Sequence, residues 1–235
     1  MKILLAACNA KYIHSNLAVF NLKAYAKEYD SQVVLREYTI NQLKDDILKD
    51  IYRCHPDVVC VSCYIWNITF VRELMQDLRK ILPDVPFWAG GPEVSYDAET
   101  FLGKNPAFNG VMVGEGEETF LELVKHYVDG SVTLEETRGL VYRKADGALQ
   151  NNGWRQLMDL SKVPFAYENL EDFENRIIYY ESSRGCPFSC SYCLSSIDKK
   201  LRFRDINLVK KELQFFLDHK VPQVKFVDRT YCFHN

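Results

Sequence analysis

Three cysteines lie close together as Cys186, Cys190 and Cys193, in the stretch ESSRGCPFSCSYC. A disulfide would use two of these thiols and leave one over. A structural Zn²⁺ site needs four ligands, usually in two separated pairs; the fourth is missing locally, although Cys232 or His219 would be within the same part of the chain. A [4Fe–4S] cluster held by three thiolates would instead leave one iron open to a substrate or cofactor.

The segments around the cysteines predict the start of an α/β domain. The run from Arg176 to Gly185 indicates a strand that ends in the cysteine loop. A helix is expected over residues 207–218 with Asn207 as its N-cap, followed by a second strand over 224–230. A closed (β/α)₈ barrel needs about 200 residues or more, whereas residues 177–235 supply only a β-α-β unit. We therefore expect an incomplete domain and a chain that is an amino-terminal fragment of a longer protein.

The cysteine stretch resembles a known signature. RGCPFSCSYC is similar to the CxxxCxxC motif of radical S-adenosylmethionine enzymes, including the aromatic Tyr192 before the last cysteine. The resemblance implies that Cys186, Cys190 and Cys193 bind a [4Fe–4S] cluster whose open iron chelates S-adenosylmethionine. Cleavage of that cofactor to a 5′-deoxyadenosyl radical would follow, with Tyr192 near the adenine.

Asp228 ends the second expected strand, in the sequence FVDR. The resemblance implies a role beside the methionine part of S-adenosylmethionine, because the family often has polar groups there. An aspartate at the end of a strand also commonly caps the following turn, and both interpretations stay open. The sequence identifies no residue as catalytic.

The first 130 residues alternate between strand and helix patterns. Five apolar runs indicate strands, and they are residues 2–8, 33–40, 58–65, 85–91 and 110–116. This rhythm predicts a doubly wound, five-stranded parallel sheet with helices on both faces. Residues 131–176 lack this alternation, and their pattern indicates a hairpin followed by a linker. We therefore expect domains at 1–130 and 177–235.

Ligands of doubly wound domains bind beyond the carboxyl ends of the strands. Glycines there let a backbone approach a ligand closely, which makes Gly90, Gly91, Gly114 and Gly116 candidate binding residues. The ordering GGPE…VGEGEETF, followed by the cysteine loop, resembles the radical S-adenosylmethionine enzymes that carry a cobalamin-binding domain. The opening NAKYIHSNLA is similar to an uncharacterised bacterial branch of that class. The resemblance implies cobalamin as a cofactor and a cobalamin-binding-like Rossmann domain at residues 1–130.

The sequence departs from part of that class at one point. Cobalamin domains in which a histidine ligates cobalt carry a DxHxxG motif after the first strand, and this chain has NAKYIH there. His14 is the nearest candidate, but a lone histidine at a helix start is more often a surface or capping residue. We therefore expect cobalamin without a motif-borne cobalt ligand.

The remaining cysteines are expected to be structural. Cys60 and Cys63 form a CxxC, but residues three apart on a strand point to opposite faces and cannot share a metal. Cys8 and Cys54 are assigned to packing, and Cys232 stays undecided. Thiols buried in apolar strands favour a reducing cytoplasm.

Composition excludes several classes of function. A net charge of −3 offers no general attraction to nucleic acid, and no apolar run reaches the roughly 18 residues of a membrane span.

Together with the resemblance above, the sequence predicts, for the full-length protein, a radical S-adenosylmethionine enzyme that acts on a small molecule by methyl transfer or radical rearrangement. Its chemistry implies an electron donor such as flavodoxin or ferredoxin. The alternative is a non-catalytic corrinoid- or zinc-binding module with a structural cysteine loop.

Overall fold

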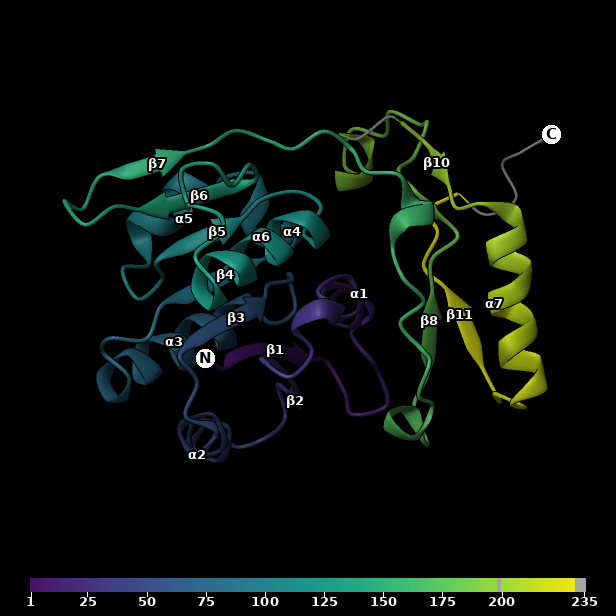
Figure 1. The fold of residues 1–235 in the computed structure, drawn as a ribbon, viewed down its shortest axis with the longest axis horizontal. Helices are drawn as coiled ribbons and strands as arrows, with labels where there is room; N and C mark the ends of the chain where they lie inside the picture. The colour runs from purple at the N-terminus through teal and green to yellow at the C-terminus, as the bar shows by residue number, and fades with distance from the viewer. Residues whose placement is uncertain (198–199, 231–235) are drawn as a thin grey trace. The chain divides into compact units, whose positions relative to one another are not determined.

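A computed structural model describes residues 1–197 and 200–230 of the chain (Figure 1). The chain divides into two compact units, residues 1–157 and 158–235. Among the described helices, none combines the length and apolar composition of a membrane-spanning segment.

The first unit is built on one seven-stranded sheet. The order is β2-β1-β3-β4-β5-β6-β7; the first five strands are parallel, and the last two pairings, β5 with β6 and β6 with β7, are antiparallel. The strands are β1 Ile3–Asn9, β2 Val33–Thr39, β3 Val58–Ser62, β4 Phe87–Gly90, β5 Gly110–Met112, β6 Leu140–Arg143 and β7 Leu149–Asn151. The five parallel strands confirm the sequence prediction.

The hairpin expected in a linker instead extends this sheet. Strand β6 pairs antiparallel with β5, with Val111 opposite Val141, and β7 pairs with β6. The backbone groups of β5 would otherwise form an unpaired edge, and β6 supplies their partners. Leu140, Val141 and Tyr142 are all buried, so β6 is part of the core. The sheet therefore has two more strands than the five that the sequence predicts.

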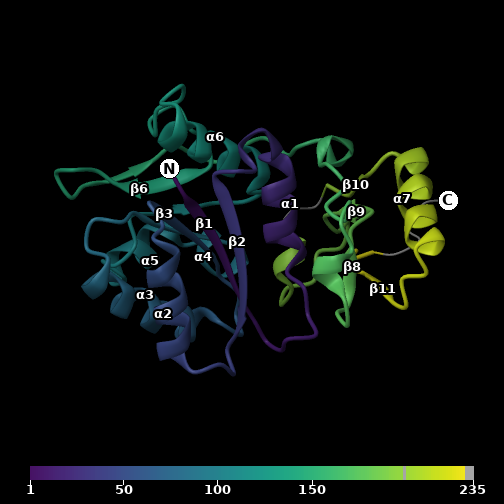
Figure 2. The ribbon, with the colours of Figure 1, turned by 60° about the horizontal axis from the view of Figure 1, so that its bottom comes forward.

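Helices cover both faces of this sheet (Figure 2). One face packs against α2, α3 and α5 through Ile47, Leu74 and Leu102, and the other packs against α1 and α6 through Val19 and Phe120. The helices of this unit are α1 Leu17–Tyr25, α2 Lys44–Cys54, α3 Ile68–Ile81, α4 Pro92–Ser95, α5 Ala98–Lys104 and α6 Glu117–Val128, with a short 3₁₀ helix η1 at Lys27–Tyr29. Burial on both faces is what a doubly wound sheet requires.

The second unit contains a β-α-β arrangement. Strands β8 Ile178–Tyr180 and β11 Val224–Phe226 are parallel neighbours, and α7 Ile206–Asp218 lies beside them (Figure 1). A small antiparallel pair joins β9 Ser183–Arg184 to β10 Arg202–Phe203. Three single 3₁₀ turns complete the unit, η2 Leu160–Lys162, η3 Glu171–Phe173 and η4 Leu194–Ser196.

Helix α7 begins one residue earlier than predicted, and Asn207 is not its N-cap. Asp205 caps it instead, because its Oδ1 accepts hydrogen bonds from the amides of Asn207 at 2.9 Å and Leu208 at 3.1 Å. A carboxylate also complements the positive end of the helix dipole. Phe216 anchors the apolar face of α7 against Tyr180 of β8, with ring centroids 6.0 Å apart.

Candidate functional site

The cysteine loop follows β9 through a glycine that no other residue can replace without strain. Gly185 has φ = +95°, and a Cβ at this position would lie 2.2 Å from the carbonyl oxygen of Lys200. L-residues rarely adopt such a φ, and a contact that short with backbone cannot be relieved by a side-chain rotation. Gly185 thereby sets the direction in which the chain enters the loop at Cys186.

The three loop cysteines differ in their exposure to solvent. Cys186 and Cys193 are partly buried and Cys190 is exposed. The amide of Cys193 donates to the carbonyl of Cys190 at 3.1 Å, so the last two cysteines flank a tight turn. None of the three is in a disulfide in the described part of the chain.

The donor set suits an iron–sulfur cluster in type and number. Three soft thiol ligands lie on one short loop that solvent reaches. Across residues 1–197 and 200–230, no three His, Cys, Asp or Glu side chains are grouped so that they could hold one metal ion. Ligation by all three sulfur atoms therefore requires rearrangement within the loop, as is common when metal binding is coupled to local folding.

The candidates for a fourth zinc ligand differ in position. His219 caps the end of α7; its Nδ1 lies 2.8 Å from the carbonyl oxygen of Phe215, and its ring packs on the Phe215 ring with centroids 4.0 Å apart. Cys232 lies outside the described residues. Among the described residues, His219 is not grouped with the three cysteines as a metal site.

The other predicted residues of this unit occupy contrasting environments. Tyr192 is 91% exposed, next to Cys193 on the loop. Asp228 is partly buried, and its Oδ1 accepts hydrogen bonds from the amides of Ser182 at 2.8 Å and Ser183 at 3.1 Å. Its Oδ2 accepts from the Ser182 hydroxyl. These contacts are with residues 45 and 46 positions before Asp228 rather than with the turn after it, so they confirm neither of its two sequence interpretations.

At the carboxyl edge of the first unit, Asn67 joins the ends of two strands. Its side chain is 0% exposed, and Nδ2 donates to the carbonyls of Cys8 at 3.0 Å and Ser62 at 3.1 Å. Its Oδ1 accepts from the amide of Tyr64 at 2.8 Å. All three contacts satisfy backbone groups where β1 and β3 end, so Asn67 determines how the loop after β3 leaves the sheet.

We expect Asn67→Ala to lower the free energy of unfolding by about 3 kcal/mol, because it leaves three backbone groups without their partner. Asn41→Ala is the matched control: the exposed Asn41 makes one such bond, to the carbonyl of Ala10 at 2.9 Å, and should cost less than about 0.5 kcal/mol. Urea denaturation of both variants measures the difference. Equal losses would contradict the role of Asn67.

The four glycines predicted as binding residues lie at this carboxyl edge: Gly90 ends β4, and the other three are in the loops that follow β4 and β5. Gly91 has φ = +110°, and a Cβ there would lie 2.5 Å from the carbonyl oxygen of Cys63. A Cβ on Gly116 would lie 3.1 Å from Leu22, while one on Gly114, where φ is +77°, would lie 3.1 Å from the ring of Trp154. A Cβ on Gly90 would lie 3.4 Å from the Met112 side chain, an ordinary contact distance. Protein contacts already account for glycine at 91, and contact of any of the four with a ligand stays a prediction.

Aromatic side chains accompany these loops. Tyr64 and Trp66 stack with ring centroids 4.4 Å apart and an interplanar angle of 10°, and Trp66 remains 49% exposed. Tyr96 and Trp154 form a second pair with centroids 5.4 Å apart. Trp154 was missed by the sequence interpretation because it lies in the segment assigned to a linker. Flat apolar surfaces of this kind suit the face of a large planar macrocycle.

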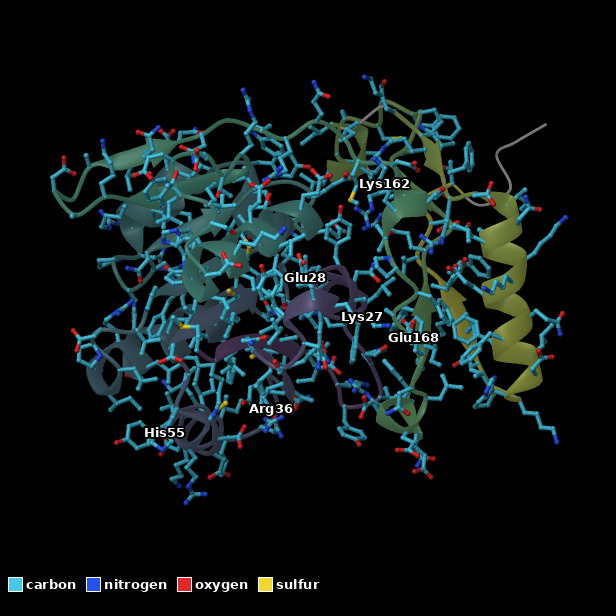
Figure 3. All side chains as sticks on the ribbon, in the orientation of Figure 1. Lys27, Glu28, Arg36, His55, Lys162 and Glu168 are labelled. Carbon is cyan, nitrogen blue, oxygen red and sulfur yellow. The ribbon has the colours of Figure 1, made fainter. Side chains whose placement is uncertain are left out.

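The histidines of the first unit lie at different places relative to the carboxyl edge of its sheet. His55 follows the last residue of α2 as its C-cap, just before β3 begins, and therefore lies at the amino edge of the parallel strands (Figure 3). His126 lies in α6, with Nδ1 3.0 Å from the carbonyl oxygen of Val132. His14 is in the loop after β1 at the carboxyl edge, where the Asn9 side chain donates to its carbonyl at 2.9 Å. A cobalt-ligating role for His14 stays untested.

The cysteines of the sheet are packing residues. Cys60 belongs to the core on the α1/α6 face and Cys63 to the core on the α2/α3/α5 face. Burial raises the pKa of both thiols and raises that of Cys8 to about 12. Protonated thiols on opposite faces do not form a metal site, as the sequence predicts.

Known proteins resemble the first unit alone and also most of the chain. Residues 3–124 match the family model of the B12 binding domain. The chain is 26% identical over 231 residues to the cobalamin-dependent radical SAM methyltransferase TokK of Streptomyces tokunonensis, covering 89% of this chain and 33% of that protein. It is 22% identical over 205 residues to the anaerobic magnesium-protoporphyrin IX monomethyl ester cyclase of Cereibacter sphaeroides, covering 82% of this chain and 32% of the cyclase.

A solved structure shares the fold. The cobalamin-dependent S-adenosylmethionine radical enzyme OxsB, with aqua-cobalamin and S-adenosylmethionine bound, superposes with a TM-score of 0.78 at 18% identity. The match covers 97% of this chain and 34% of OxsB. The chain thus spans about a third of the length of these relatives. With a family match over residues 3–124, the chain belongs to the B12-binding domain family, and its relatives include cobalamin-dependent radical S-adenosylmethionine enzymes.

Proposed function

We propose that the full-length protein is a cobalamin-dependent radical S-adenosylmethionine enzyme that modifies a small molecule by methyl transfer or radical rearrangement. The observation that carries this proposal is the loop of three closely spaced cysteines, which follows a B12-binding domain in the chain and lies between β8 and α7 of a β-α-β unit. Three thiols rather than four leave one coordination position for a cofactor.

In this proposal, Cys186, Cys190 and Cys193 bind a [4Fe–4S] cluster as thiolates. When bound, the cluster supplies the single electron that cleaves S-adenosylmethionine, and cobalamin supplies a carrier for a methyl group. The loop's position directly after β9 holds the ligands at the carboxyl end of β8, the edge at which α/β units bind their ligands. Tyr192 is proposed to contact the adenine, since its exposed ring adjoins Cys193.

The first unit is proposed to bind cobalamin at its carboxyl edge. Gly90 ends β4, and Gly91, Gly114 and Gly116 lie in the loops after β4 and β5. The stacked Tyr64–Trp66 pair offers an exposed flat surface at the same edge. The fit rests on that surface and on closely approached backbone, both of which suit a macrocycle with apolar faces and an amide-bearing rim. No DxHxxG motif contributes a cobalt ligand.

The test uses the full-length protein, purified and reconstituted with iron and sulfide without oxygen. Incubation with S-adenosylmethionine and a low-potential reductant is expected to yield 5′-deoxyadenosine, and reduced flavodoxin or ferredoxin is expected to replace the chemical reductant. A protein that instead holds one equivalent of zinc and leaves S-adenosylmethionine intact would support a zinc- or corrinoid-binding module.

The same assay separates the two reaction types. In methyl transfer, S-adenosylmethionine also donates its methyl group, so S-adenosylhomocysteine accumulates beside 5′-deoxyadenosine. In rearrangement or cyclisation, only the radical cleavage consumes S-adenosylmethionine. The relatives include enzymes named for each kind of reaction, a methyltransferase and a cyclase.

A further inference from the structure

The four residues that precede Cys186 are held from two directions. On one side, β9 pairs with β10, and the amide of Arg204 donates to the carbonyl of Ser182 at 2.9 Å. On the other side, Asp228 reaches back from the end of β11. The start of the cysteine loop is therefore attached to the elements that follow it in the chain.

Asp228 provides three of these attachments. One carboxylate oxygen accepts the amides of Ser182 and Ser183, and the other accepts the Ser182 hydroxyl. Hydrogen bonds to an ionised acceptor are stronger than neutral ones. Because Ser183 is 3% exposed, its amide has little access to water if the carboxylate is removed.

The position of Asp228 is itself fixed by the sheet. Strand β11 lies in register with β8, with Phe226 opposite Tyr180, and the amide of Val227 donates to the carbonyl of Tyr180 at 2.9 Å. The carboxylate is thus delivered next to the segment that leads through Gly185 into the loop. We expect a displacement of Ser182 and Ser183 to shift Cys186, because only Arg184 and Gly185 separate Ser183 from Cys186.

We propose that Asp228 is a positioning residue for the cysteine loop, acting through Ser182 and Ser183, and this rests on the proposed function of that loop. The carboxylate acts as a hydrogen-bond acceptor for the backbone. Asparagine should therefore replace it well: its Oδ1 can accept both amides, and its Nδ2 can donate to the Ser182 oxygen. Alanine removes every contact.

The experiment compares Asp228→Ala and Asp228→Asn in the full-length protein. Asp218→Ala is the matched control, because Asp218 is exposed and accepts a hydrogen bond from the Gln214 side chain at 2.7 Å rather than from backbone amides of the segment before Cys186. In the iron-free protein, hydrogen exchange of the Ser182 and Ser183 amides should accelerate by about tenfold or more in Asp228→Ala, as expected for loss of a charge-assisted bond. It should stay near wild type in Asp228→Asn and in the control.

After anaerobic reconstitution, iron content and the electron paramagnetic resonance signal of the reduced cluster should fall in Asp228→Ala and recover in Asp228→Asn. Unchanged amide exchange in Asp228→Ala overturns the proposal. So does an Asp228→Asn variant with normal exchange and iron content but weakened S-adenosylmethionine binding, which would make Asp228 a cofactor contact. Absence of iron uptake by the wild type would count against the proposed function, while the exchange data would still decide whether Asp228 holds this segment.

Discussion

Replacing Cys190 with alanine in the full-length protein is expected to abolish both the visible absorbance of the reconstituted cluster and the formation of 5′-deoxyadenosine. Cys190 is the exposed member of the three loop thiols, so its removal leaves no cavity and should alter the free energy of unfolding by less than about 0.5 kcal/mol. Two thiolates cannot hold a cluster with a single open iron. Loss of activity without loss of stability is therefore the expected signature.

Cys54→Ala is the control for this variant. Cys54 is, like Cys190, outside any disulfide, but it is partly buried and ends α2 in the first unit, away from the cysteine loop in the sequence. It should retain its iron content and its yield of 5′-deoxyadenosine. A Cys190→Ala protein that reconstitutes with as much iron as Cys54→Ala would contradict cluster binding by the loop.

The sequence predicts best what is local in the chain. The cysteines fall within eight residues of one another, and the five parallel strands each appear as an apolar run. Contacts between distant segments are not visible in such patterns. Asp228 meets residues 45 and 46 positions earlier, and periodicity gives no sign of this pairing. The same limit explains why β6 was expected in a linker, since only the neighbouring β5 shows that it completes a sheet.

Glycine patterns show a second limit. The sequence supports a close backbone approach at Gly91 but not the identity of the approaching group, which in the structure is the carbonyl of Cys63. Likewise, Asn207 and Asp205 are both good N-caps by residue type, and only the hydrogen bonds from Asp205 decide between them. Residue type thus limits what a position can do, while the choice depends on neighbours brought by the fold.

Glu212→Ala is expected to destabilise the second unit by about 3–5 kcal/mol, because it leaves a buried guanidinium without its counterion. Glu212 and Arg204 are each 8% exposed in their side chains; Arg204 Nη2 lies 2.5 Å from Glu212 Oε1, and Nε lies 2.9 Å from Oε2. The Tyr180 hydroxyl also donates to Oε2 at 2.6 Å. Burial and this hydrogen bond raise the pKa of Tyr180, so it stays a neutral donor.

This network connects α7 to the last residue of β8, a few residues before β9 and the cysteine loop. We therefore expect cluster uptake to weaken together with stability. Lys211→Ala, on the exposed neighbour of Glu212, serves as the control and should be nearly neutral. Chemical denaturation, with amide exchange in α7 and β8 as a local measure, reports the effect. A double variant, Arg204→Met with Glu212→Leu, should recover much of the loss, because no charge is then left buried. If the double variant is as unstable as Glu212→Ala, the loss arises from packing rather than from the unpaired charge.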